Sequence, residues 1–173
     1  VGLLAQDFIS TNARNLYIVA YAMLIFSFVM YFVDRYSNSN KNIEQLNRMQ
    51  IFFIGMAQSL ALIPGFSRSG VTITAARFLG ISRSDAARFS FLLSVPAIVL
   101  AGIYEAFGVA ADNQSGWGQT ILATIISFIV GYLSIAWLIK WLSTHSLRSF
   151  VIYRVVLALV IIGLLNSGII AAL

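Results

Sequence analysis

Long apolar runs separated by short polar turns dominate this chain. Residues 16–33 and 119–139 contain no charged side chain, and 84–107 and 149–170 contain few. Each run is about 18 residues or longer, which is enough to cross a hydrocarbon core roughly 30 Å thick. We therefore predict one all-α membrane domain, residues 1–173, with about four transmembrane helices at these ranges.

A fifth apolar stretch, residues 51–80, is interrupted near its middle. Pro64 has no backbone N–H and disfavours helix in the residue before it, and Gly65 permits a sharp turn. The arms on either side, 51–63 and 71–80, are too short to span a bilayer comfortably. At 1.5 Å per residue, the first arm would reach about 20 Å into the membrane. This pattern predicts a re-entrant helical hairpin.

The composition supports a membrane protein and excludes several other classes. The chain is 60% hydrophobic and 10% charged, with a mean hydropathy of +0.89, far outside the range of soluble domains. It has no cysteine, so thiol catalysis, thiolate metal sites and disulfides are excluded. The net charge of +5 is better explained by basic turns that fix membrane orientation than by nucleic-acid binding.

The basic turns also predict an orientation. Lysine and arginine gather in the turns at 83–88 and 140–148, whereas the 108–118 loop carries only Asp112. Because positive loops remain on the cytoplasmic side, the hairpin is predicted to enter from that side and to open its tip toward the outside.

A polar cluster lies at the predicted hairpin tip. Ser67, Arg68 and Ser69 follow the break, and the next helix is predicted to start near Gly70. A guanidinium has five donors, and the N–H groups at a helix start attract anions, so the cluster suits a phosphate. As alternatives, Ser67, Ser69 and Thr72 could simply cap the helix, and Arg68 could be a structural charge.

Other polar residues receive less specific interpretations. We expect Arg77 to reach the head groups, with a second phosphate contact as the alternative. His145 is interpreted as a solvated loop histidine, and Glu105 as an interfacial carboxylate. No carboxylate lies within an apolar run near Arg68, so the sequence shows an anion clamp without an evident base or metal ligand.

Three segments carry a resemblance to a known family. PGFSRSGVT at 64–72, FLGISRSDAARFSFLLSVPAI at 78–98 and WLSTHSLRSFVIYR at 141–154 resemble, in this order, the undecaprenyl-diphosphate phosphatase family known for bacitracin resistance. The similarity covers most of the chain, which looks like the C-terminal two-thirds of a member. We expect the N-terminal repeat to be missing and these residues alone to be catalytically incomplete.

The resemblance implies a function and a location. Family members are bacterial plasma-membrane proteins with two inverted repeats, and they hydrolyse undecaprenyl diphosphate to undecaprenyl phosphate at a site that faces outward. The product lipid carries cell-wall precursors. The implied partners are the polyprenyl diphosphate and membrane lipid, with no nucleic acid, and a homodimer is one alternative. A transporter or flippase for a phosphorylated lipid is the alternative function.

The resemblance also assigns roles to the residues at the tip. Arg68 and Ser67 would be catalytic, and Ser67, Arg68, Ser69, Gly70 and Thr72 would bind or support the diphosphate. A divalent cation, Mg²⁺ or Ca²⁺, is implied as cofactor. Its ligands are expected to lie outside this chain, in which we identify no metal ligand.

Overall fold

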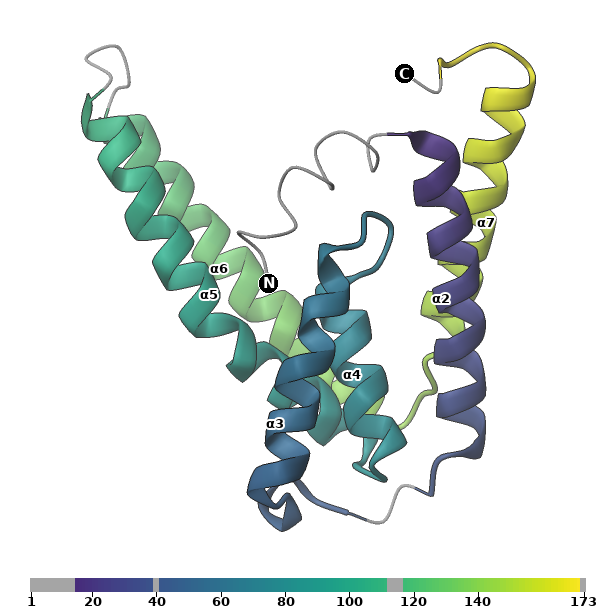
Figure 1. Cartoon of the computed structure of the whole chain (residues 1–173). Coiled ribbons are helices and arrows are strands. Elements are labelled where there is room, and N and C mark those ends of the chain that lie inside the picture. The colour runs from purple at the N-terminus through teal and green to yellow at the C-terminus, as the bar shows by residue number, and fades with distance from the viewer. Residues whose placement is uncertain (1–14, 39–40, 112–116, 172–173) are drawn as a thin grey trace.

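The computed structural model describes residues 15–38, 41–111 and 117–171, and these ranges are mostly helical (Figure 1). Four of the described helices are long and apolar enough to cross a membrane, which confirms the predicted number of spans. The elements are α2 (Leu16–Tyr36), η1 (Ile43–Gln45), α3 (Arg48–Ala57), η2 (Gln58–Leu62), α4 (Arg68–Phe78), α5 (Arg83–Ala111), α6 (Trp117–Leu142) and α7 (Arg148–Asn166).

Several helices differ in length from the predicted spans. α2 continues to Tyr36 instead of ending at 33, because Asp34 is buried and has partners in the folded chain. α5 continues through Pro96 to Ala111, four residues beyond the predicted end. α7 ends at Asn166 instead of 170, shortly before Gly168, which has a φ of +72°. The N-terminal stretch 1–14 lies outside the described residues, as does Asp112.

The predicted re-entrant hairpin is formed by α3, η2 and α4. Asn47 caps α3 by accepting a hydrogen bond from the N–H of Gln50 at 2.8 Å. The first arm continues from α3 as a 3₁₀ helix to Leu62, and Ile63 is extended before the proline, as the sequence predicts. The second arm begins at Arg68, two residues before the predicted start.

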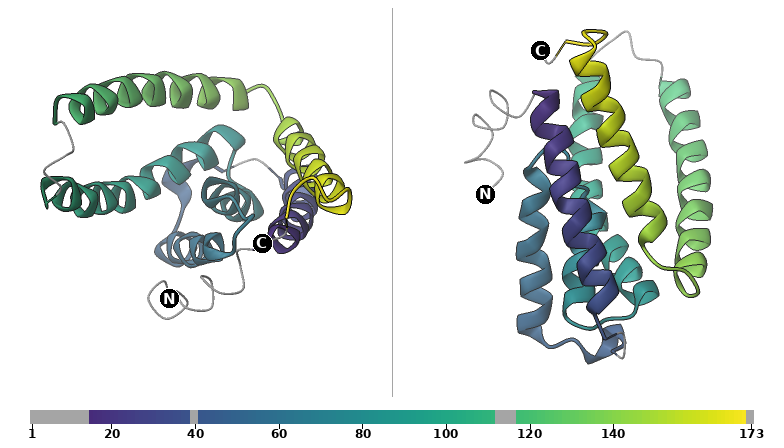
Figure 2. Two further views of the ribbon diagram at one scale, coloured as in Figure 1. Left: turned by 90° about the horizontal axis from the view of Figure 1, so that it is seen from above. Right: turned by 90° about the vertical axis from the view of Figure 1, so that its right-hand side faces the viewer.

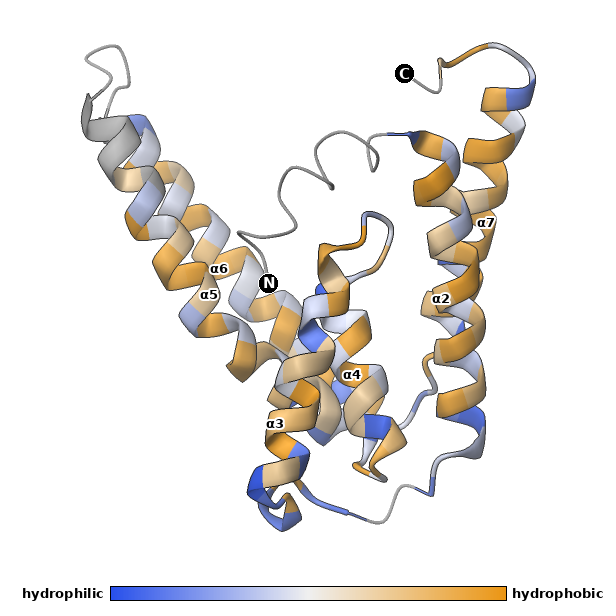
Figure 3. Ribbon diagram, viewed as in Figure 1, coloured by the Kyte–Doolittle hydropathy of each residue, from blue (hydrophilic) through white to orange (hydrophobic). Residues whose placement is uncertain are grey.

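The helices form two pairs with the hairpin between them (Figures 1 and 2). α2 packs along α7, and α5 packs along α6. One end of the molecule, which we call the base, contains the C-terminal ends of α2 and α6 (Figure 1). The N-terminal ends of α3, α5 and α7 lie at the same end. Apolar residues dominate the spans, and strongly polar residues gather at the base (Figure 3).

Two apolar clusters hold these pairs together. The larger one joins both arms of the hairpin to the start of α5 and to the connection between α6 and α7, and it includes Ile54, Ala76 and Leu142. The smaller one lies between α2 and α7 around Ala20 and Ala158, both fully buried. The small side chains allow the two helices to approach closely, as is typical of membrane helix pairs.

The hairpin tip depends on Gly65. Its φ is +94°, and a Cβ atom there would lie 2.5 Å from the carbonyl oxygen of Val19 on α2. Gly65→Ala is therefore expected to lower the free energy of unfolding by about 1–3 kcal/mol, measured by thermal denaturation in detergent. Gly55→Ala is the control, because that Cβ meets no atom within 4 Å. Equal melting temperatures for the two variants would contradict the tight fit at the tip.

Candidate functional site

A pocket of about 280 Å³ opens beside the start of α4. Its polar part is contributed by Ser67, Ser69 and Gly70 from the tip and by Arg154 from α7. The rest of the lining is mostly apolar and comes from α2, α4, α5, α6 and α7. The pocket therefore places hydroxyl groups, a helix N-terminus and one cation next to a hydrocarbon wall.

Ser67 shapes the first turn of α4. Its backbone is extended, with φ −79° and ψ 127°, and its hydroxyl oxygen accepts a hydrogen bond from the N–H of Gly70 at 3.2 Å. Its carbonyl oxygen accepts from Val71 at 2.8 Å. The capping role that the sequence leaves open for Ser67 is confirmed. The N–H groups of Arg68 and Ser69 precede the first intrahelical hydrogen bond of α4 and face the same end of the helix.

Arg154 is the residue that sequence analysis missed. From α7, its Nη2 donates to the carbonyl oxygen of Gly65 at 2.8 Å and its Nε to the hydroxyl of Ser27 at 3.2 Å. Its guanidinium carbon also lies 5.3 Å from the centre of the Phe26 ring. The available signal was an arginine inside an apolar span, because such residues are costly there unless they have a partner or a function.

Arg68 does not share this pocket in the structure. It is the first residue of α4, and its side chain is exposed at the tip and is absent from the pocket lining. Thus the structure brings together Ser67, Ser69 and Gly70 from the predicted set and adds Arg154. The hairpin is broken at Pro64, and Arg68 lies at the opposite end of α4 from the base (Figure 1).

Thr72 supports the tip and does not line the pocket. It is 1% exposed, and its hydroxyl lies 3.1 Å from the carbonyl oxygen of Arg68 and 3.2 Å from that of Ser69. The same hydroxyl lies 2.5 Å from that of Ser90 on α5. Since Ser90 is also buried, this pair connects α5 to the turn that carries the polar cluster.

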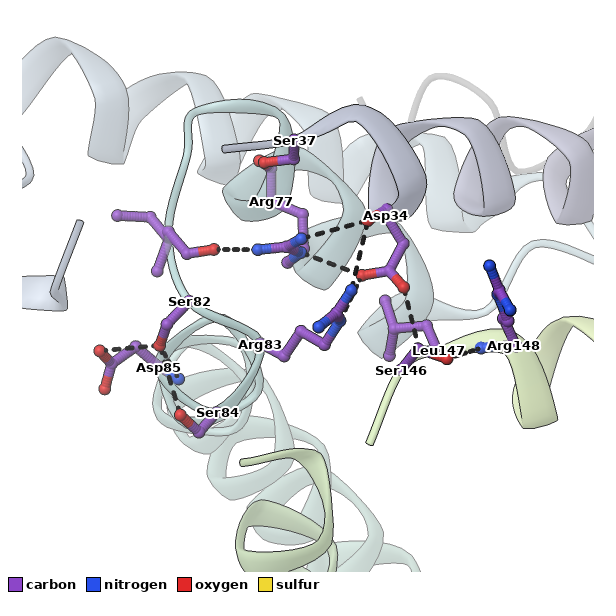
Figure 4. Close-up of polar contacts among 11 residues, drawn as sticks. Asp34, Ser37, Arg77, Ser82, Arg83, Ser84, Asp85, Ser146, Leu147 and Arg148 are labelled. Carbon is purple, nitrogen blue, oxygen red and sulfur yellow. Dashed lines mark hydrogen bonds and ion pairs between the residues drawn. The ribbon is translucent and has the colours of Figure 1, made fainter. Parts of the chain in front are cut away.

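The position of Arg77 in the structure contradicts both of its predicted roles. It is fully buried at the base, where its Nε donates to Asp34 at 3.1 Å and its Nη1 to the carbonyl oxygen of Ile81 at 2.7 Å (Figure 4). The Ser37 hydroxyl bonds to its carbonyl oxygen. The predicted span at 16–33 ends just before Asp34, so the sequence did not indicate a buried ion pair between α2 and α4. Arg77 thus contacts neither head groups nor the pocket.

His145 is not among the residues that line the pocket. His145 is exposed, as predicted, and its ring stacks on Trp141 with 4.6 Å between the ring centres. The side chain of Glu105 lies outside the described residues. Across the part of the chain that the structure describes, no group of three His, Cys, Asp or Glu residues could hold a metal ion.

These features define a class of protein. It is a helical protein with four apolar spans among its described residues, and its broken hairpin brings hydroxyls, a helix N-terminus and an arginine to one pocket. Within that class, the chain belongs to the family described as bacitracin resistance protein BacA, which it matches over residues 1–160. Family membership and the four spans together make it a multi-pass membrane protein.

Relatives of known name are similar over nearly the whole chain. The undecaprenyl-diphosphatase of Nocardia farcinica is 47% identical over 176 residues, which cover 99% of this chain and 56% of the relative. The protein of the same name from Mycolicibacterium smegmatis is 46% identical over 99% of this chain and 63% of its own length. The chain therefore spans less than two thirds of the length of these relatives.

Proposed function

We propose that the full-length protein hydrolyses undecaprenyl diphosphate to undecaprenyl phosphate and inorganic phosphate. The observation that carries this proposal is the pocket in which Ser67, Ser69, Gly70 and Arg154 adjoin an apolar wall. A lipid diphosphate has the same two parts, an anionic head and a hydrocarbon tail. The names of the relatives agree with this substrate.

The polar residues at the tip would act on the diphosphate. The N–H groups at the start of α4 and the guanidinium of Arg154 would bind its oxygens, and exposed Arg68 would turn toward the terminal phosphoryl group. Water supplies the oxygen of the new P–O bond, the bond to the bridging oxygen breaks, and the bridging oxygen leaves with the lipid phosphate. Arg68 would offset the negative charge that develops on the transferred group, and Ser67 would orient it.

The apolar wall would hold the first part of the prenyl chain. Ile73, Phe91, Leu138 and Phe150 contribute to it. In the proposed orientation, the base lies at the cytoplasmic face of the bacterial plasma membrane and the tip opens outward, as the basic turns of the sequence indicate.

The described pocket does not fit a divalent cation. Mg²⁺ and Ca²⁺ prefer carboxylate oxygens, and no Asp or Glu is among the residues that line the pocket. Carboxylate ligands for Mg²⁺ or Ca²⁺, and a general base, would have to come from outside the described residues.

One experiment separates the phosphatase from a lipid transporter, which broken membrane helices would also suit. The full-length protein is placed in vesicles with labelled undecaprenyl diphosphate, and both phosphate release and movement of the label between leaflets are measured. The proposal predicts release of inorganic phosphate. Movement of the label without phosphate release would reject the enzyme and favour the transporter.

Arg154→Met is expected to lower phosphate release roughly 10- to 100-fold, because a charge-assisted hydrogen bond to the substrate contributes about 1.5–3 kcal/mol. Arg154→Lys should recover part of this loss. The control is Arg88→Met, which removes an exposed arginine of α5 that is not part of the pocket lining. If Arg154→Met released phosphate as fast as wild type, Arg154 would have only a structural role, in which it binds the carbonyl group of Gly65.

A further inference from the structure

A second, polar pocket lies at the base, away from the hairpin tip. It has a volume of about 380 Å³ and forms where three spans begin or end. Each span contributes an arginine: Arg35 from the last turn of α2, Arg83 from the start of α5 and Arg148 from the start of α7. The pocket is also lined by the connection between α6 and α7.

The acidic residue in this pocket, Asp34, already has hydrogen-bond and ion-pair partners within the chain. Asp34 is 5% exposed, and its Oδ1 accepts from Arg83 at 2.7 Å, while its Oδ2 accepts from the backbone N–H of Leu147 at 3.1 Å (Figure 4). The same Oδ1 accepts from a second, fully buried arginine. One carboxylate thus offsets only part of the charge of two guanidinium groups, and the hydrogen bonds to its oxygens come from these two arginines and from Leu147.

The positive charge of the pocket is therefore in excess. Arg35 and Arg148 are exposed, and neither forms an ion pair with a carboxylate in the described part of the chain. Hydroxyl groups of Thr144 and Ser146 and the ring of His145 add hydrogen-bonding groups to the same lining. Guanidinium and hydroxyl groups that converge on a polar pocket are typical of phosphate recognition.

We propose that this pocket binds the phosphate group of an anionic membrane lipid. The reason for a lipid is position: all three arginines lie at the ends of membrane-spanning helices, where head groups lie. Basic pockets between such helices bind anionic head groups, whose phosphates attract each nearby arginine. The site differs from the pocket at the tip, with which it shares only Leu147, and it does not depend on the proposed phosphatase activity.

The proposal can be tested with the double variant Arg35→Gln/Arg148→Gln of the full-length protein in detergent. Native mass spectrometry measures the Kd for the first bound phosphatidylglycerol and, separately, for phosphatidylcholine. We expect wild type to prefer phosphatidylglycerol and the double variant to bind it roughly 30-fold more weakly, about fivefold for each arginine removed. Arg83 is left in place because it is paired with Asp34.

Arg48→Gln is the matched control, since Arg48 is an exposed arginine at the base that does not line the pocket. It should bind phosphatidylglycerol as wild type does. An equal loss of phosphatidylglycerol affinity in this control, or no loss of affinity in the double variant, would overturn the proposed site. Inorganic phosphate should displace the lipid more strongly than chloride at the same ionic strength. Equal displacement by chloride would show general attraction to a basic surface and overturn the proposal.

A last comparison separates a lipid head group from soluble phosphate. Inorganic phosphate is titrated into wild type in phosphatidylcholine nanodiscs, and its affinity is compared with that of phosphatidylglycerol. We expect the lipid to bind more tightly because its tails remain in the bilayer. Tighter binding of inorganic phosphate would reject a lipid site.

Discussion

Arg68→Ala in the full-length protein is expected to lower phosphate release by about 10²–10³-fold, mainly in kcat, because a fixed charge that stabilises the transition state would be lost. Arg68 begins α4, and its exposed side chain has no ion pair or hydrogen bond within the described residues. It can therefore turn toward an anion at the helix N-terminus without breaking a contact. Steady-state assays of phosphate release on undecaprenyl diphosphate measure the effect.

The controls for Arg68→Ala separate charge from position. Arg68→Lys keeps the charge but loses the fork geometry, so we expect partial activity. Arg48→Ala removes an exposed arginine at the opposite end of the hairpin and should leave kcat unchanged. If Arg68→Ala raised only KM, Arg68 would bind the ground state and transition state equally, which would contradict the assigned role.

The hairpin could be predicted from sequence because its cause is local. Pro64 and Gly65 interrupt an apolar run through their own backbone chemistry, and Ser67 caps the next helix within three residues. The span of α6 was predicted for the same kind of reason, since length and hydropathy in one continuous run decide it.

The contacts that complete the pocket could not be predicted, because they join residues far apart in the chain. Arg154 reaches Gly65 across 89 positions. Its sequence neighbours indicate only an apolar span with one charge, and the partner depends on how α7 packs against the tip. Ser90 and Thr72, 18 positions apart, meet for the same reason. Local patterns identified the polar tip but not the helices that surround it.

The base shows how a polar residue can be assigned to the wrong environment. Asp34 follows an uncharged run and precedes a polar, turn-rich segment, so hydropathy alone ends the helix before it. In the structure, two arginines and a backbone N–H surround its carboxylate and allow it to be buried. Burial of a charge depends on partners, and Arg77 and Arg83 are more than 40 residues away in the chain.

Asp34→Asn is expected to lower the free energy of unfolding by about 3–5 kcal/mol, because it leaves the fully buried guanidinium of Arg77 without its counter-ion. The carboxylate also bonds to Arg83 and to the N–H of Leu147, so the substitution weakens contacts between α2 and the starts of α5 and α7. Unfolding monitored by circular dichroism in mixed micelles with increasing dodecyl sulfate measures the loss.

The matched control for this substitution is Asp85→Asn. Asp85 is a half-buried carboxylate in the first turn of α5 that accepts a hydrogen bond from the Ser82 hydroxyl at 3.0 Å and has no arginine partner among the described residues. It should cost far less stability. Asp34→Asn/Arg77→Gln should unfold less readily than Asp34→Asn alone, since the unpaired buried charge is gone. The contrary result would be a double variant whose free energy of unfolding is lower than that of Asp34→Asn by as much as Arg77→Gln alone lowers it in wild type. In that case Arg77 would not depend on Asp34 for its charge balance, and the ion pair would not hold α4 against α2.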